Sequence, residues 1–132
     1  MRKILGIMLT VVMCMSFTIV SFAASKVVDG YGTLSGTVAA TMNTQCLINT
    51  VTSVTANPDN AYMKVQIEIQ DYDGYTLWTD DESSERGRTS FLHDFEVVHF
   101  DDVKKIYSAH NIQGGRTYAA QVVYTSTTDI PY

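Results

Sequence analysis

The feature that most constrains the fold is a strict alternation of apolar and polar residues along residues 62–70. Successive side chains of a β-strand point to opposite faces of a sheet, so this pattern predicts a strand with one buried and one solvated face. The predicted buried face carries Met63, Val65, Ile67 and Ile69, and the solvated face carries Tyr62, Lys64, Gln66, Glu68 and Gln70. A helix does not fit, because its apolar residues would recur every three to four positions.

Further runs of this kind, separated by turn residues, follow along most of the chain. They cover residues 32–42, 45–56, 75–79, 91–100, 103–110 and 118–127. Shared faces are formed by Leu34, Val38 and Met42, by Cys46, Ile48 and Val54, by Phe91, Phe95 and Val97, and by Tyr118, Ala120, Val122 and Tyr124. The chain is therefore expected to contain about seven strands. They predict an all-β fold, a small antiparallel β-sandwich, and a small β-barrel is the alternative.

The N-terminus carries the parts of a secretory signal peptide. Arg2 and Lys3 give it a positive start, residues 4–20 are uncharged and mostly apolar, and small residues follow. The apolar run is shorter than the roughly 20 residues that span a membrane core, which favours a cleaved signal helix over a membrane anchor.

The predicted cleavage site lies between Ala23 and Ala24, because the small residues Ser21 and Ala23 fit the positions that signal peptidases require. Cleavage after Ala24 is the second choice. The chain therefore divides into a signal peptide, residues 1–23, and a single β-sandwich domain, residues 24–132. We predict a secreted, extracellular protein of bacterial type with no membrane span after cleavage.

The charge balance excludes one class of partner. Acidic residues number 14 against nine basic ones, and two of the nine, Arg2 and Lys3, lie in the predicted signal peptide. Nucleic-acid binding needs a basic patch, so no nucleic-acid partner is expected. An acidic domain is also repelled by anionic membrane surfaces.

No metal or other cofactor is predicted. Residues 71–82 resemble an EF-hand loop in three acidic positions, but Gly74 stands two places before the glycine that such a loop requires. His93 and His99 lie on one predicted strand, roughly 20 Å apart, and are too distant to share an ion. Cys46 remains alone once the signal is removed, and its place in an alternating run favours a buried thiol over an intermolecular disulfide.

Catalytic motifs are also missing from the sequence. Ser35 lacks the Gly-x-Ser-x-Gly context of a hydrolase nucleophile, and no cysteine-protease signature surrounds Cys46. Most carboxylates fall in predicted loops, where solvated charge is the usual state. We therefore predict a protein that is not an enzyme.

The predicted binding residues are Tyr62, Tyr72 and Tyr75. A two-residue turn at Asp73-Gly74 would pair Tyr72 with Tyr75 across a hairpin, on the solvated face that Tyr62 shares. Neighbouring tyrosines can stack on a sugar or contact a protein, or can simply stabilise the hairpin. The same turn would pair Ile69 with Trp78 and place Trp78 in the core.

These features favour a secreted, non-enzymatic β-sandwich that binds a protein or a glycan. Two alternatives remain open from the sequence. One is a small secreted effector or bacteriocin-like toxin, and the other is an extracellular hydrolase with a site assembled from scattered residues. The oligomeric state is left open.

Overall fold

The chain forms nine β-strands in a computed structural model that describes residues 18–19, 23–42, 45–98 and 103–129, and these residues contain no helix. The strands are β1 (Thr18–Ile19), β2 (Ala23–Val28), β3 (Gly32–Met42), β4 (Gln45–Val54), β5 (Tyr62–Asp71), β6 (Thr76–Ser83), β7 (Ser90–Val98), β8 (Val103–Gln113) and β9 (Gln121–Ser126). The seven predicted strands correspond to β3–β9, whereas β2 was not predicted.

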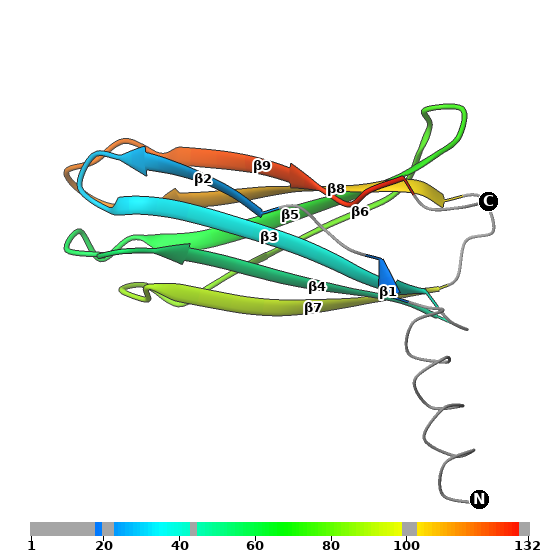
Figure 1. The fold of residues 1–132 in the computed structure, drawn as a ribbon. Helices are drawn as coiled ribbons and strands as arrows, with labels where there is room; N and C mark the ends of the chain where they lie inside the picture. Colours follow the sequence, from blue (N-terminus) through cyan, green and yellow to red (C-terminus); the bar gives the residue numbers. More distant parts are fainter. Residues whose placement is uncertain (1–17, 20–22, 43–44, 99–102, 130–132) are drawn as a thin grey trace, which may run out of the picture.

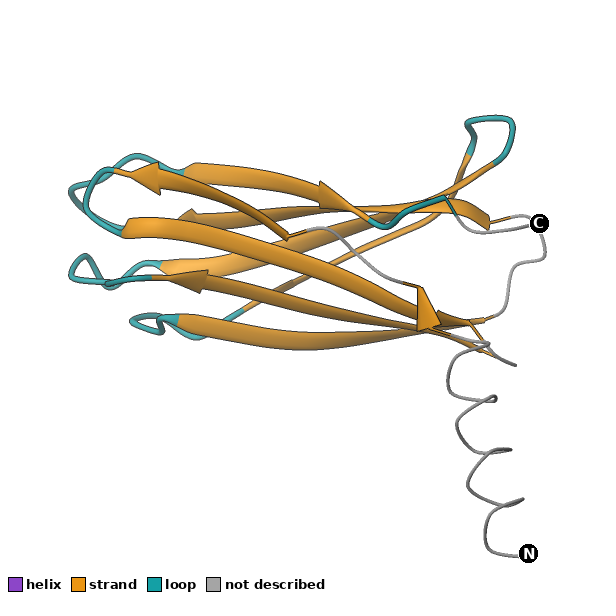
Figure 2. Ribbon diagram, viewed as in Figure 1, coloured by secondary structure: helices purple, strands orange, loops and turns teal. Residues whose placement is uncertain are grey.

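Two antiparallel sheets pack face to face, so the predicted β-sandwich is confirmed. One sheet has β4 between β3 and β7, and both β1 and β2 pair with the outer edge of β3. The other sheet has the order β6-β5-β8-β9. Figure 1 shows all the long strands running along one axis of the molecule, and Figure 2 shows loops only at its two ends.

The predicted signal peptide falls largely outside the described residues, which exclude 1–17 and 20–22. Thr18 and Ile19 pair with Thr41 and Ala40 of β3. The predicted cleavage site lies at the start of β2, where Ala23 is opposite Thr37. Cleavage at that site would leave β2 five residues, Ala24–Val28, paired with β3.

The core lies between the sheets, and the shared faces predicted on β3, β4, β5 and β7 point into it where the structure describes them. Buried side chains include Leu34, Val38, Ile48, Val54, Met63, Val65, Ile67, Ile69, Phe95, Val97, Ile106 and Ile112. Met42 and His99 lie outside the described side chains. Cys46 is buried and free, as predicted, and burial raises the pKa of its thiol to about 11. This thiol is therefore protonated and unreactive at neutral pH.

One buried polar side chain connects the two sheets through a hydrogen bond. His110 on β8 is fully buried, and its ring nitrogens lie 2.7 Å from the hydroxyls of Thr52 on β4 and of Ser108 on β8. A Cβ on Gly36 would lie 2.2 Å from the imidazole, so only glycine leaves room for this ring. Burial lowers the pKa of His110 to about 4, and the ring is therefore neutral under physiological conditions.

The hairpin between β5 and β6 differs from the predicted two-residue turn. The backbone N–H of Asp71 donates to the carbonyl of Tyr75 at 3.0 Å, so Tyr72 lies within the turn. The predicted pairing of Tyr72 with Tyr75 is therefore wrong. The physical reason is the carboxylate of Asp71, whose Oδ1 accepts the backbone N–H groups of Asp73 and Tyr75 and closes a wider turn.

The predicted pairing of Ile69 with Trp78 is confirmed despite the wider turn, because a register shift between Ile69 and Gln70 compensates for it. Trp78 faces inward and is half-buried. Its ring packs edge-on against Phe95 at a centroid distance of 6.3 Å. Trp78 is thus part of the packing between the sheets, as predicted.

Two other strand limits differ from the predictions. Residues 80–83 were expected in a loop, yet they extend β6, because an edge strand can carry charged side chains that face water. Residues 118–120 were expected in a strand but precede β9, whose buried residues are Val123 and Thr125. Tyr124 therefore points outward.

Candidate functional site

The solvent-facing side of the β6-β5-β8-β9 sheet contains a hollow of about 530 Å³. The outward residues of β5 lie in register with those of β8 and β9: Gln66 is opposite Ala109, and Ala109 is opposite Tyr124. Glu68 is opposite Tyr107 in the adjacent row. All five residues line the hollow.

Two tyrosines form the aromatic part of this hollow. Tyr107 on β8 is 39% exposed, and Tyr124 on β9 is 72% exposed. They are diagonal neighbours on paired strands, a relation that places Cα atoms roughly 7–8 Å apart. Ala109 lies directly opposite Tyr124, and because its side chain is only a methyl group, it leaves the space beside the Tyr124 ring open.

Glu68 is held in place by two hydrogen bonds on a single carboxylate oxygen. Its Oε1 accepts the Thr76 hydroxyl at 2.5 Å and the Gln70 amide at 3.0 Å. These bonds stabilise the charged form, with Thr76 having the larger effect, and lower the pKa of Glu68. Among the described residues no group donates to Oε2, so this oxygen is available to a ligand.

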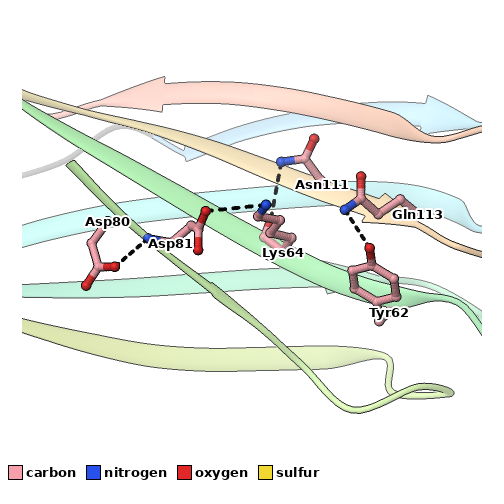
Figure 3. Close-up of polar contacts among 6 residues, drawn as sticks. All are labelled: Tyr62, Lys64, Asp80, Asp81, Asn111 and Gln113. Carbon is pink, nitrogen blue, oxygen red and sulfur yellow. Dashed lines mark hydrogen bonds and ion pairs between the residues drawn. The ribbon is translucent and has the colours of Figure 1, made fainter.

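The charge of the lining is acidic. Glu68 and Asp81 face the hollow, whereas Asp80 lies opposite the inward-facing Ile67, and the Nζ atom of Lys105 lies over the ring of Tyr107 at 5.8 Å. Lys64 reaches from β5 to Asp81 on β6, with its Nζ 3.4 Å from the carboxylate (Figure 3). Within the described part of the chain, no three acidic, histidine or cysteine side chains are grouped so that they could hold a metal ion.

Tyr62, a predicted binding residue, is engaged in a structural contact. The Gln113 amide donates to its hydroxyl at 3.0 Å (Figure 3), and the Arg86 guanidinium lies over its ring at 5.3 Å. Arg86 also donates to the carbonyls of Asn60 and Gly114. Tyr62 therefore belongs to a contact network that joins the connections at one end of the sandwich.

Tyr72 and Tyr75, the other two predicted binding residues, lie in the hairpin at the opposite end of β5. They are 39% and 71% exposed, respectively. Since β5 has 10 residues, this hairpin is roughly 30 Å from Tyr62. The structure thus brings Tyr72 and Tyr75 into one turn but does not bring Tyr62 to them.

The solvated face of β5 was predicted, but the aromatic residues beside its centre, Tyr107 and Tyr124, were not. Tyr107 alternates with Ile106 and Ser108, and that alternation predicts that the Tyr107 side chain is exposed to solvent. Its place next to Glu68 follows only from the pairing of β5 with β8, two strands far apart in the sequence.

No family model matches this chain, and neither a curated protein nor a solved structure matches it. The described residues include no helix that is long and apolar enough to cross a membrane.

Proposed function

We propose that this chain is an exported, non-enzymatic binding protein that recognises a carbohydrate with the outer face of its β6-β5-β8-β9 sheet. The observation that carries the proposal is the pair of exposed tyrosines, Tyr107 and Tyr124, in a hollow that also contains Gln66 and Glu68. Binding sites for small ligands are concave, partly aromatic, and contain a few polar groups that fix orientation.

A sugar fits this combination better than a protein surface does. The apolar face of a pyranose ring can stack on a tyrosine, and its hydroxyl groups need both donors and acceptors at close range. Gln66 offers an amide and Glu68 offers a fixed acceptor. A protein partner would be favoured by a larger continuous apolar patch, whereas the exposed apolar residues Val27 and Leu92 lie on the other sheet, on β2 and β7.

The arrangement of the buried histidine supports a non-enzymatic role. Ser108 and His110 have the hydrogen bond of a nucleophile and its base, at 2.7 Å. His110 is fully buried between the sheets, however, so a substrate cannot reach the pair. A nucleophile must be accessible from a cleft to react.

Calorimetric titration with β-1,4-linked oligosaccharides tests the proposal. The Tyr107→Ala, Tyr124→Ala double variant should lose about tenfold or more in affinity, because truncating a tyrosine at the centre of a binding surface commonly costs more than 1 kcal/mol. Leu92→Ala on β7 is the matched control, since Leu92 is also exposed but lies on the other sheet. Unchanged sugar affinity in the tyrosine double variant, or binding to a protein alone, would reject the proposal.

Export is tested separately. The full chain, expressed with its N-terminus intact, should appear outside the cell and begin at Ala24. Edman sequencing of the exported material decides this, and secreted protein that still begins with Met1 would contradict the predicted processing.

A further inference from the structure

We propose that the outer edge of β3 becomes a docking site for a second copy of this chain once the predicted signal peptide has been removed. The site consists of residues 38–42, the C-terminal part of β3. Two copies pair there in antiparallel direction and join their sheets edge to edge. The proposal rests on the predicted cleavage after Ala23 and is independent of carbohydrate binding on the other sheet.

The outer edge of β3 is covered by β1 and β2, which both come from the N-terminal part of the chain. β2 pairs with residues 32–37, and Thr18–Ile19 of β1 pair with Thr41 and Ala40 (Figure 1). β1 lies within the predicted signal peptide, whereas all of β2 except Ala23 stays after cleavage. Processing therefore removes the strand that lies beside the C-terminal part of β3 and leaves the rest of the edge covered.

The uncovered edge presents backbone groups that a partner strand can use. These groups alternate in direction along a strand, and the Thr33 N–H points to the β4 side, where it donates to the Thr55 hydroxyl. The register of β3 is unbroken, so Val38 and Ala40 present their N–H and C=O groups to the outer edge. Their side chains are fully buried and hold this backbone in place. Unpaired groups on such an edge are a template for another chain.

The absence of charge distinguishes this edge from two others. Residues 30–58, which include all of β3 and β4, contain no aspartate, glutamate, lysine or arginine. The edge strand β6 carries Asp80 and Asp81, and the edge strand β7 carries Asp94 and Glu96. Pairing either of these edges with its own copy would bring like charges together, which opposes association. Two β3 edges meet without this repulsion.

The fourth edge, β9, is also uncharged, but β2 packs beside it and remains after processing. The β3 edge is thus the one that processing uncovers. Antiparallel pairing of this edge with itself is symmetric, so the same residues serve both copies, as in most homodimers. The contact is short, and the dimer should therefore be weak, as for interfaces that bury less than about 1,200 Å².

Sedimentation velocity of the exported, processed chain tests the proposal. A dimer should appear as the concentration is raised to about 1 mM, the range in which weak interfaces associate. Ala39→Lys combined with Thr41→Lys should weaken association roughly tenfold, because the added lysines lie opposite each other across the two edges. Thr33→Lys combined with Ser35→Lys is the matched control. It adds the same charge to the same face of β3, beside the part of the edge that β2 covers, and should leave association unchanged.

Amide hydrogen exchange of the unaltered processed chain locates the contact without any substitution. The amides of Val38 and Ala40 should become more protected as the protein concentration rises. The Ala39 amide points to β4 and should be protected at every concentration.

Three results would overturn the proposal. One is a processed chain that stays monomeric, and another is a dimer that forms equally well with the lysines at positions 39 and 41 or that protects a different edge. The third is exported material that still contains Thr18 and Ile19, because this edge would then be covered. None of them bears on the sugar titration, whose tyrosines lie on the other sheet.

Discussion

The two faces of the β6-β5-β8-β9 sheet are built from the same strands but are suited to different tasks. On β8, Ile106, Ser108 and His110 point into the core, while Tyr107 and Ala109, which alternate with them, point into solvent. On the inner face, no buried polar side-chain atom of the described residues lacks a hydrogen-bond partner. On the outer face, the Tyr124 ring is largely exposed, and the Tyr107 ring is partly covered by the Lys105 side chain.

This contrast shows how one β-sheet can stabilise the fold with its inner face and bind a ligand with its outer face. Inward side chains lie in a closed environment, in which a change of volume or charge is costly. Outward side chains can be replaced with little effect on folding, because water takes up their contacts. Substitutions on the inner face should therefore alter the free energy of unfolding, and those on the outer face should alter affinity.

The largest expected effect is on the inner face. Ile106→Ala should lower the free energy of unfolding by about 2–5 kcal/mol, because Ile106 is fully buried and its removal leaves a cavity. Sugar affinity of the molecules that remain folded should be unchanged. Denaturant unfolding measures the stability, and a loss below about 1 kcal/mol would show that this face tolerates cavities.

Acid should destabilise the same face through His110. The folded-state pKa is about 4 and the ordinary value is 6.5, so the unfolded chain binds a proton more readily than the folded chain between these values. The stabilisation is complete above pH 6.5 and is lost as the pH falls toward 4, by about 3 kcal/mol at 1.36 kcal/mol per pKa unit.

The control for this acid effect is His110→Gln, which cannot titrate. Its unfolding midpoint, followed from pH 7 to pH 4, should fall less steeply than that of the unaltered chain. Identical slopes would show that His110 does not control the pH dependence, and that the carboxylates alone do.

Trp78→Ala tests the edge of the inner face. Trp78 is only half-buried against Phe95, so the substitution should cost about 2 kcal/mol, less than a fully buried tryptophan would. Differential scanning calorimetry gives the change. A variant as stable as the unaltered chain would place Trp78 outside the core packing.

The smallest expected effect is at the hairpin. Tyr72→Ala combined with Tyr75→Ala should change stability by less than about 0.5 kcal/mol, as for surface substitutions in general. It should also leave sugar affinity unchanged, because the hairpin residues do not line the hollow. Loss of binding in this double variant would show that the hairpin tyrosines form the binding site. It would contradict the assignment of binding to the outer face of the sheet.

Local patterns were sufficient to predict β3–β9 but neither β2 nor the site. Met63 to Ile69 alternate so strictly that the inward face of β5 follows from the sequence. The segment from Gln121 to Ser126 mixes apolar and hydroxyl residues on both faces, so the pattern did not show that Val123 and Thr125 point inward and Tyr124 outward. Charges at Asp80 and Asp81 resemble a loop because an edge strand needs no apolar alternation.

The remaining part of the site depends on which strands pair, and the sequence does not contain that information in any local form. Glu68 and Tyr107 are neighbours because β5 pairs with β8, and Tyr124 joins them because β9 pairs with β8. The contact between Thr52 and His110 likewise joins two sheets. Long-range pairing of this kind is determined by the packing of the whole fold.

The most direct test of the outer face as the binding surface is a titration of the isotope-labelled protein with a β-1,4-linked oligosaccharide, followed by amide chemical shifts. We expect the largest shift changes at Gln66, Glu68, Ala109 and Tyr124, with little change along β4 and β7. Shift changes concentrated in the Tyr72–Tyr75 hairpin or on the β3-β4-β7 face would contradict the assignment of binding to this hollow.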